Sequence, residues 1–370
     1  MKVLIAAGGT GGHIYPALAI ADQLKEKNKN TEIIFVGTKN GMESRIVPAA
    51  GYPFKIIRAR WFSRKPSVDT LKSIKELILG MNDSRRLIKQ YDPDVVIGTG
   101  GYVCGPVLYW AARKGKRTLI HEQNAYPGAT NRLLAKYVDD IAVGFDKAKD
   151  FFEQKDKVFY SGNPVRRVFF EISKEEGRKQ LKFDSDDQIV VSLGGSLGAQ
   201  SINQAMLELI KGQKEKKNLK IVHITGKNNY NDFIEKTGKL GISMKDDSLR
   251  IIEYAENIPA LFAAADLIVS RAGAMTVAEI TASKTASVLV PYPYATGNHQ
   301  EHNARSIIEN DAGWMVIDEK VKENPSAFAK QIMEWLQDQE RLEKMGTQAY
   351  RLSNRDSAER IVQKIETSKD

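Results

Sequence analysis

The sequence predicts an α/β protein built from two Rossmann-like halves, each with a parallel sheet covered by helices. Short apolar runs typical of buried strands alternate along the chain with helix-like segments, which is the pattern of parallel sheets. Three strand-like runs end in glycine-rich loops that lead into helices, two early in the chain and one past its midpoint. A length of 370 residues is sufficient for two such domains with separate hydrophobic cores.

The first glycine loop, Gly8-Gly9-Thr10-Gly11-Gly12-His13, joins a strand at 2–7 to a helix at 14–27. Such a turn lets backbone approach a ligand closely and points a helix N-terminus at it. The loop does not match the dinucleotide-binding fingerprint G-x-G-x-x-G, because position 14, where the last glycine is required, is Ile14. His13 adds a group that takes up a proton near neutral pH beside this anion site. A tight turn with an incidental histidine is the alternative.

The other elements follow in the same alternation. We expect further strands of the first half at 31–37, 54–59, 94–98, 117–120, 139–144 and 157–160, and helices at 42–50, 69–90, 104–114 and 126–137. Strands of the second half are expected at 188–193, 219–224, 249–253, 266–269, 286–290 and 313–317. Glycine and proline break the pattern at Ser161-Gly162-Asn163-Pro164, which predicts domains at 1–163 and 164–354. The remaining helical segment, 355–370, is long enough to cross back onto the first domain.

Two more glycine loops follow strand-like runs. They are Gly98-Thr99-Gly100-Gly101-Tyr102 and Gly194-Gly195-Ser196. Ligands of open parallel sheets bind at the carboxyl ends of the strands, where all three loops are expected to lie. The cluster His121-Glu122-Gln123-Asn124 follows another strand and is a candidate by the same argument of position.

A further candidate site begins after the strand at 266–269. The segment Ala274 to Glu279 starts a helix whose free N–H groups can hold a diphosphate, and Glu279 is placed to accept hydrogen bonds from a ribose diol. An ordinary helix with one surface glutamate is the alternative. The polar side chains at the helix start Asn298-His299-Gln300 can form hydrogen bonds with sugar hydroxyls.

Cysteine and histidine usage excludes several classes of site. With Cys104 as its one cysteine, the chain has no internal disulfide framework, and its five histidines show no metal-binding spacing. An Asp-x-Asp pair occurs as Asp92-Pro93-Asp94, but at the amino end of a strand, away from the expected site. We therefore expect no metal and no cofactor. No secretory signal or membrane-spanning segment is recognisable.

Charge is unevenly distributed. Residues 1–160 hold 26 Lys and Arg against 16 Asp and Glu, a net of +10, whereas the remaining residues carry a net of −1. Within 58–89 the basic residues alternate with large apolar ones, among them Trp61, Phe62, Leu77 and Ile78. Such a surface suits an anionic membrane face, although charge runs are often only solvated surface. No nucleic-acid-binding motif accompanies the charge, so we expect no nucleic acid partner.

Together these motifs resemble the MurG family of bacterial transferases over nearly the full chain. The matching segments are Gly8 to His13, Gly100 to Val103, His121 to Asn124, Gly162 to Arg166, Gly194 to Ser196, Arg271-x-Gly273-Ala274-x-Thr276-Val277-x-Glu279 and Gln300-x-x-Asn303-Ala304. Members of this family attach N-acetylglucosamine to the lipid-linked muramyl-pentapeptide precursor of peptidoglycan.

The resemblance implies a fold of the GT-B type, with two Rossmann-like domains whose sheets face a deep cleft and with the donor mainly in the C-terminal one. It implies His13 as the catalytic base. It implies contacts to UDP-N-acetylglucosamine from Thr10, Gly11, Gly12, Asn124, Arg166, Ser196, Ala274, Met275, Thr276, Val277, Glu279 and Gln300. It implies loops for the acceptor diphosphate at Gly12, Gly100, Gly101 and Tyr102.

The activity so implied is inverting transfer of N-acetylglucosamine to the 4-hydroxyl of an undecaprenyl-linked N-acetylmuramoyl-pentapeptide, without a metal. The enzyme would be peripheral on the cytoplasmic side of the cell membrane, against its anionic surface. Two alternatives remain open: a UDP-N-acetylglucosamine 2-epimerase on the same fold, which needs no basic amphipathic surface, and a non-catalytic membrane adaptor. The alignment at Tyr294 to Gly297 leaves the choice between His299 and Gln300 as the sugar contact open.

Overall fold

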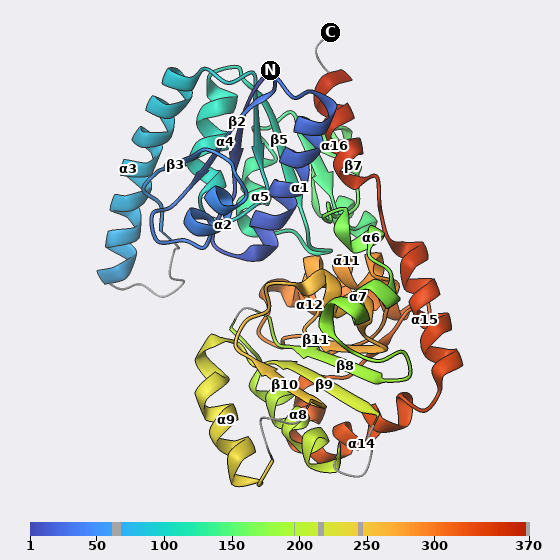
Figure 1. Ribbon diagram of the computed structural model, residues 1–370. Helices are drawn as coiled ribbons and strands as arrows, with labels where there is room; N and C mark the ends of the chain where they lie inside the picture. The colour runs from blue at the N-terminus through green and yellow to red at the C-terminus, as the bar shows by residue number, and fades with distance from the viewer. Residues whose placement is uncertain (61–67, 196, 214–217, 243–246, 368–370) are drawn as a thin grey trace. The chain divides into compact units, whose positions relative to one another are not determined.

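The computed structural model describes residues 1–60, 68–195, 197–213, 218–242 and 247–367. The chain divides into two compact units (Figure 1): Met1–Arg166 together with Asn354–Asp370, and Arg167–Ser353. Each unit is a parallel sheet covered by helices, which confirms the predicted fold class. Within the described residues, no helix is long and apolar enough to cross a bilayer.

The first unit contains a seven-stranded sheet in which all neighbouring strands are parallel. Its strands are β1 (Lys2–Ala6), β2 (Glu32–Gly37), β3 (Phe54–Ile56), β4 (Val95–Gly98), β5 (Arg117–Glu122), β6 (Asp140–Val143) and β7 (Val158–Tyr160). Their spatial order is β3-β2-β1-β4-β5-β6-β7, so strand order reverses between β1 and β4. In such doubly wound sheets, ligands bind outside the carboxyl ends of the strands at the reversal.

Helices cover both faces of this sheet. Helices α1 (Gly11–Lys27), α2 (Glu43–Ala49) and α16 (Ser357–Thr367) pack on one face, and α3 (Val68–Tyr91), α4 (Cys104–Arg113) and α5 (Ala129–Leu134) pack on the other. Two 3₁₀ turns, η1 (Asp146–Phe151) and η2 (Lys155–Lys157), precede β7. Side chains of a strand alternate between faces, so Val3 and Ile5 of β1 join the core under α1, whereas Leu4 joins the core under α4.

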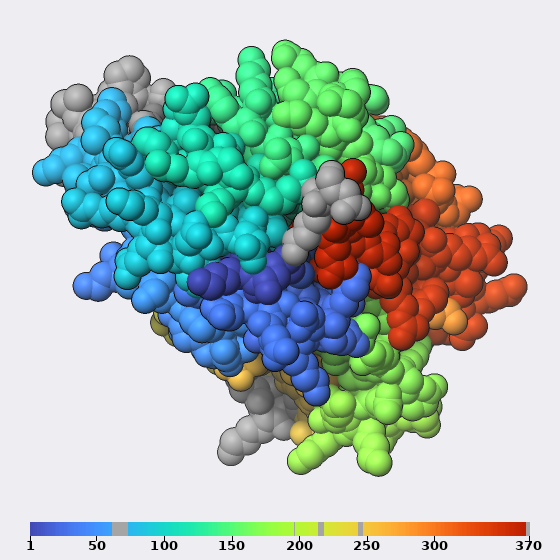
Figure 2. Space-filling model, turned by 90° about the horizontal axis from the view of Figure 1, so that it is seen from above, coloured from blue at the N-terminus to red at the C-terminus, as the bar shows by residue number. Residues whose placement is uncertain are grey.

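The last helix, α16, belongs to the first unit although it follows the whole second unit in the chain. Its apolar residues Ile361, Val362 and Ile365 are buried in the core shared with α1. Figure 2 shows this red helix against the blue N-terminal segment, in agreement with the contacts between α1 and α16. An apolar stripe with this spacing covers one helical face, which is what a terminal helix needs to dock.

The second unit contains a six-stranded parallel sheet. Its strands are β8 (Gln188–Leu193), β9 (Leu219–Ile224), β10 (Leu249–Ile252), β11 (Leu267–Ser270), β12 (Ala286–Leu289) and β13 (Trp314–Met315). The order β10-β9-β8-β11-β12-β13 repeats the topology of the first unit, with its reversal between β8 and β11. The loops after these two strands therefore occupy the position that binds ligands in this topology.

The helices of the second unit are α6 (Val168–Glu171), α7 (Lys174–Leu181), α8 (Gln200–Gly212), α9 (Tyr230–Lys239), α10 (Ile258–Ala264), α11 (Ala274–Ala282), α12 (His299–Ile308), α13 (Asp318–Glu323), α14 (Pro325–Trp335) and α15 (Gln339–Leu352). Two 3₁₀ turns, η4 (Lys227–Asn229) and η5 (Thr296–Asn298), precede α9 and α12. Side chains of α8, α9, α14 and α15 form one core cluster with the strands. Four helices, α7, α10, α14 and α15, begin at a side-chain cap.

Candidate active site

Two glycine loops of the first unit lie side by side at the strand-order reversal, because β1 and β4 are neighbours in the sheet. The loop after β1 continues into α1, which begins at Gly11 with Thr10 as its N-cap residue. No side chain caps this helix start, and uncapped N–H groups in the first turn of a helix are the kind that bind anions. The hydroxyl of Thr99, in the loop after β4, donates to the carbonyl of His13 at 2.8 Å and joins the two loops.

His13 is half-buried between these loops. Its Nδ1 lies 2.9 Å from the carbonyl oxygen of Gly8, a pure acceptor, so Nδ1 carries the proton in the neutral ring. Nε2 is then left with its lone pair. Burial lowers the pKa of His13 below its ordinary 6.5, against the opposing effects of the Gly8 hydrogen bond and of the Glu122 and Glu43 charges. The ring is therefore neutral at pH 7, and Nε2 can accept a proton.

Gly100 makes room for the His13 ring. A Cβ on Gly100 would stand 2.6 Å from Cδ2 and 2.9 Å from Nε2 of His13, closer than side-chain atoms approach one another. Gly100 also has φ of +110°, a conformation that other residues rarely adopt. The ring of Tyr102, from the same loop, covers Gly9. The loop residues Thr10 to His13 and Gly100 to Tyr102 therefore lie next to each other in the first unit, with Gly100 buried against the His13 ring.

A buried carboxylate supports the first loop from behind. The Glu43 side chain accepts hydrogen bonds from the backbone N–H of Gly9 (3.2 Å) and from the N–H and hydroxyl of Thr38 (2.9 and 2.8 Å). Glu43 is fully buried. Sequence reasoning missed this role, because a glutamate in the first turn of a helix is usually a surface residue that complements the helix dipole. The available signal was the pair Gly37 and Gly41, where a side chain would collide with Glu43.

The cluster after β5 is mostly turned inward. His121 is fully buried, with Nε2 donating to the carbonyl of Gly162 (3.1 Å) and Nδ1 accepting from the Gln123 amide (2.9 Å). Burial lowers the pKa of His121 to about 4, so it stays neutral. The expectation that the whole cluster supplies ligand contacts is therefore corrected: the side chains of His121, Glu122 and Gln123 are buried within the unit. Of these three, Glu122 contacts Asn124 directly, whereas Gln123 donates to the carbonyl of Thr99 at 2.7 Å.

Asn124 remains the partly exposed member of this cluster. Its backbone N–H and side-chain amide donate to Glu122 Oε1 at 2.9 and 3.2 Å, while Glu122 Oε2 accepts from the N–H of Gly128 and from Asn131, both at 2.9 Å. One carboxylate thus ties the Asn124 loop to the start of α5. Arg166, at the end of the unit, stacks its guanidinium on the ring of Tyr15, 5.0 Å from the ring centroid.

In the second unit, α11 begins directly after β11, at the strand-order reversal. Gly273 is its N-cap residue and no side chain caps the first turn, in contrast to the capped starts of α7, α10, α14 and α15. The backbone N–H groups of Ala274, Met275 and Thr276 are therefore available to an anion. Val277 and Glu279 follow on the same helix, and the Glu279 side chain is partly exposed.

The loop after β8 lies beside the start of α11, because β8 and β11 are paired. At Gly198 the backbone has φ of +78°, and a Cβ would collide with the carbonyl of Thr225. Asn229 donates to the carbonyls of Leu197 (3.0 Å) and Thr225 (3.3 Å), which fastens this loop to the loop after β9. The predicted donor contact Ser196 lies outside the described residues.

Arg271 joins several segments at this edge of the second unit by an ion pair and hydrogen bonds. Its guanidinium pairs with Asp318 at 2.6 Å and donates to the carbonyls of Val290 (3.1 Å) and Pro291 (3.2 Å) and to the hydroxyl of Ser201 (3.2 Å). Asp318 is buried, so a matched charge partner is needed there. The sequence motif contains Arg271 but does not reveal its role, because no local pattern indicates a partner 47 positions away.

The loop after β12 leads through η5 into α12. The carbonyl oxygen of the Gln300 side chain accepts from the backbone N–H of Tyr292 at 2.9 Å. His299 Nδ1 lies 2.8 Å from the carbonyl of Thr296. Both side chains are half-buried at the first turn of α12, so the structure leaves both as candidates.

No cluster of three or more metal-ligating side chains occurs among the described residues. Asp94 accepts from the backbone N–H of Lys2 at 2.7 Å, and Asp92 pairs with Lys116. Both carboxylates lie before β4, at its amino end, and are bound to neighbouring strands there. This agrees with the interpretation of Asp92-Pro93-Asp94 as a strand-start turn.

Comparisons with known proteins agree with this architecture. Residues 3–143 match the glycosyltransferase family 28 N-terminal domain, and residues 189–361 match the glycosyltransferase family 28 C-terminal domain. The solved structure of MurG from Acinetobacter baumannii is similar over 99% of both chains, with a TM-score of 0.73 and 25% identity. A UDP-GlcNAc 2-epimerase from Neisseria meningitidis reaches a TM-score of 0.69 over 100% of both chains, but its 13% identity shows a shared fold alone.

Curated relatives are closer in sequence and carry one name, UDP-N-acetylglucosamine–N-acetylmuramyl-(pentapeptide) pyrophosphoryl-undecaprenol N-acetylglucosamine transferase. The protein of that name from Thermoanaerobacter sp. (strain X514) is 46% identical over 367 residues, which cover 99% of this chain and 100% of the relative. The one from Acetivibrio thermocellus is 43% identical over 365 residues, covering 99% and 97%. The chain therefore belongs to glycosyltransferase family 28 and, within it, to the MurG family of N-acetylglucosamine transferases.

Proposed function

We propose that this chain transfers N-acetylglucosamine from UDP-N-acetylglucosamine to the N-acetylmuramyl sugar of a pentapeptide-bearing pyrophosphoryl-undecaprenol acceptor. This is the step of peptidoglycan synthesis that converts lipid I into lipid II. The observation that carries the proposal is His13, held neutral at the strand-order reversal of the first unit with Nε2 ready to accept a proton. Full-length similarity to transferases named for this reaction supports the choice of substrates.

The chemistry is a single displacement. The 4-hydroxyl of the acceptor sugar attacks the anomeric carbon of the donor, the bond from that carbon to the diphosphate oxygen breaks, and UDP leaves with the bonding electrons. Nε2 of His13 takes the hydroxyl proton as the new bond forms. Attack on the face opposite the leaving group inverts the configuration and yields a β-1,4 linkage.

We assign the donor mainly to the second unit. The first turn of α11 meets the diphosphate with backbone N–H groups and the positive end of the helix dipole, so no step of the scheme requires a metal. Glu279 accepts from the ribose hydroxyls, and Gln300 or His299 reads the sugar. Thr10, Gly11, Gly12, Asn124 and Arg166 of the first unit stay predicted donor contacts, and Ser196 stays a prediction outside the described residues.

We assign the acceptor to the first unit. The glycine loops at Gly12 and at Gly100-Gly101-Tyr102 offer backbone to its diphosphate, next to His13. Because that acceptor is a lipid, we also propose that this unit contacts the anionic cytoplasmic surface of the membrane, which makes the protein peripheral there.

Helix α3 supports the membrane contact. Its side chains include Ile74 (42% exposed), Leu77 (37%) and Ile78 (64%), next to exposed Arg85, Arg86 and Lys89. Exposed apolar and basic side chains on one helix are typical of binding to anionic lipid. Within 58–89, Arg58 is ion-paired with Asp83, and elsewhere in this unit Lys116 pairs with Asp92 and Arg117 with Asp140. The predicted members Trp61, Phe62, Arg64 and Lys65 lie outside the described residues.

A transfer assay tests the proposed function as a whole. With radiolabelled UDP-N-acetylglucosamine and lipid-linked acceptor, we expect label in the lipid product at the same rate with and without excess EDTA. Loss of transfer in EDTA that magnesium restores would contradict the metal-free scheme. An isomerised sugar nucleotide without labelled lipid would instead establish the 2-epimerase alternative.

Replacing His13 tests its role as the base. The variant His13→Gln keeps a donor for the Gly8 carbonyl but has no basic nitrogen, so we expect kcat to fall about 10²–10⁴-fold while donor affinity is retained. In the parent enzyme, kcat/KM should stay level above pH 6.5 and fall only at lower pH, because burial lowers the pKa of His13. The exposed His302→Gln serves as the control. A variant with intact kcat and lost donor affinity would make His13 a binding residue.

Replacing Glu279 tests the ribose contact. A hydrogen bond to a charged group contributes about 1.5–3 kcal/mol, so Glu279→Gln should weaken UDP and UDP-N-acetylglucosamine alike by about tenfold or more. Isothermal titration calorimetry with UDP measures this directly. The control is Glu334→Gln, an exposed glutamate of α14. Equal UDP affinity in Glu279→Gln and the parent removes Glu279 from the donor site.

Reversing the charge of α3 tests the membrane contact. Each basic residue at an anionic surface contributes about 1 kcal/mol before screening, so the triple variant Arg85→Glu, Arg86→Glu, Lys89→Glu should bind anionic vesicles about tenfold or more weakly. Lipid-acceptor turnover should fall while UDP affinity is unchanged. The matched control reverses Lys179, Lys236 and Lys239 of the second unit, which changes net charge equally. Unchanged vesicle binding by the α3 variant would place the membrane contact elsewhere.

A further inference from the structure

The peptide group between Gly8 and Gly9 connects two titratable side chains of the first unit. Its carbonyl oxygen, on Gly8, accepts from Nδ1 of His13 at 2.9 Å. Its N–H, on Gly9, donates to Oε2 of Glu43 at 3.2 Å. A carboxylate and an imidazole are thus joined through a single amide. We call this series of groups, Glu43, the Gly8–Gly9 peptide group and His13, the Glu43 relay.

Glu43 is held so that Oε2 faces this peptide group. It is the first residue of α2, and its other oxygen, Oε1, accepts from the backbone N–H and the hydroxyl of Thr38 at 2.9 and 2.8 Å. Thr38 follows β2, the neighbour of β1 in the sheet. With Oε1 fixed by two donors, Oε2 is directed to Gly9. Both oxygens accept in these bonds, as an ionised carboxyl group does.

Glycines leave the space that the Glu43 relay occupies. A Cβ on Gly41 would stand 2.1 Å from Oε1 of Glu43, and a Cβ on Gly101 would stand 2.3 Å from the carbonyl oxygen of Gly8. Both distances are too short for a side chain to be accommodated. Glu43 and Gly8 are buried, so water does not compete for these hydrogen bonds. Charges in such surroundings are screened much less than at a surface.

The carboxylate acts on His13 in two ways. Hydrogen bonds in series polarise one another, so a carboxylate that accepts from the Gly9 N–H makes the Gly8 carbonyl a stronger acceptor for Nδ1–H. The second effect is electrostatic. Burial lowers the pKa of His13, and the negative charges of Glu122 and Glu43 oppose this effect because they stabilise the protonated ring. The protonated ring is the form that His13 reaches when Nε2 takes up a proton.

We propose that Glu43 is a positioning residue for the transfer reaction, and that it acts on His13 through the Gly8–Gly9 peptide group. Glu43 holds the carbonyl that selects the Nδ1–H tautomer, and its charge stabilises the ring when Nε2 takes the proton of the acceptor hydroxyl. No proton passes along the relay, because Nδ1 keeps its own. This inference rests on the proposed function, since it concerns the step that we assign to His13.

The arrangement has a counterpart in the Ser-His-Asp triad. There a buried acid contacts the histidine directly, fixes its tautomer and stabilises the imidazolium ion, without becoming protonated itself. In this chain an amide lies between the acid and the ring. The peptide group lets a carboxylate from α2 act on a histidine of α1 although the two side chains are not hydrogen-bonded to each other.

Other titratable side chains near His13 belong to the elements packed against it. Glu122, at the end of β5, is the second negative charge that acts on the ring. Tyr102, in the loop after β4, covers Gly9. Burial raises the pKa of Cys104, at the start of α4, to about 12, so its thiol stays neutral. A substitution at Glu43 leaves all three in place, and a change in the titration of His13 then reports the relay.

The variant Glu43→Gln tests the relay. Its side chain has nearly the same shape, but it carries no charge and presents an amide nitrogen where Gly9 needs an acceptor. A hydrogen bond to a charged group is lost, so we expect kcat for transfer of labelled sugar to fall about tenfold to a hundredfold. The affinity for UDP, measured by calorimetry, should stay as in the parent, because we assign the nucleotide mainly to the second unit.

The pH dependence separates the relay from mere support of the loop. Loss of the Glu43 charge lowers the pKa of His13 further, so kcat/KM of the variant should begin to fall at a lower pH than in the parent. A loop that is only loosened would admit water to the ring and raise this pKa toward 6.5. NMR titration of the histidine rings measures the shift directly, with the His13 signal assigned by its loss in His13→Gln. A shift to higher pH, or none, would overturn the proposal.

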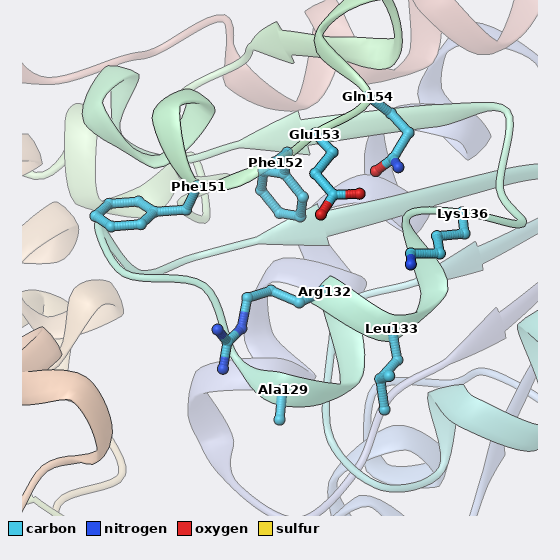
Figure 3. A pocket seen from close by; sticks show the side chains of 8 residues that line it. All are labelled: Ala129, Arg132, Leu133, Lys136, Phe151, Phe152, Glu153 and Gln154. Atoms are coloured by element: carbon cyan, nitrogen blue, oxygen red, sulfur yellow. The ribbon is translucent and has the colours of Figure 1, made fainter.

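Two further variants serve as controls. Glu153→Gln removes one charge from an exposed glutamate of the same unit, which lines the pocket between α5 and residues 151–154 (Figure 3). No residue of the Glu43 relay lines that pocket, so kcat and its pH dependence should stay as in the parent. Glu43→Asp keeps the charge, and we expect the pH dependence of the parent with a kcat above that of Glu43→Gln.

Thermal unfolding of each variant is measured in parallel. If Glu43→Gln does not fold, Thr38→Val decides, because it removes only the hydroxyl that holds Oε1. A several-fold lower kcat with unchanged UDP affinity is then expected, and an unchanged kcat would overturn the proposal. The parent enzyme tests the proposed function separately. If the parent transfers no sugar to the lipid acceptor, that function fails; if it does and folded Glu43→Gln has the same kcat, only the relay fails.

Discussion

The hydrogen bond between Nδ1 of His13 and the carbonyl of Gly8 is the interaction on which the candidate site depends. It selects the tautomer, and by doing so it determines which nitrogen keeps a lone pair. The neighbouring loop makes the bond possible, since Gly100 leaves space for the ring where any side chain would collide with it. Burial then keeps the ring neutral at physiological pH. A single backbone acceptor thus orients the ring for the role of base that we propose for His13.

Buried carboxylates stabilise the loops of the candidate site by accepting hydrogen bonds from them. Glu43 accepts three hydrogen bonds from the first loop and from Thr38, and Glu122 accepts four from Asn124, Gly128 and Asn131. A buried charge is costly unless several donors surround it, so each carboxylate restricts the loops that supply those donors. The loops can therefore be rich in glycine at the site and still keep a defined shape. Arg271 and Asp318 have a similar role in the second unit.

The two units share one strand order, and the function that we propose assigns a different chemistry to each of them. In the first unit the reversal carries a titratable side chain, whereas in the second it carries the uncapped start of α11. Acid–base work needs a side chain whose proton moves, and binding of a diphosphate needs only fixed N–H dipoles. The same topology accommodates both, because the loops at the carboxyl ends of the strands vary without disturbing the sheet.

The sequence by itself determined the elements of both sheets, the glycine loops and His13. Strand periodicity and glycine turns are local patterns, and in a parallel sheet they place every such loop at one edge. Only the tertiary structure decided which nitrogen of His13 keeps its lone pair, that His121 and Gln123 are buried, and that Glu43 and Arg271 hold the loops. Each of these depends on contacts between residues far apart in the chain, and no local pattern encodes such contacts.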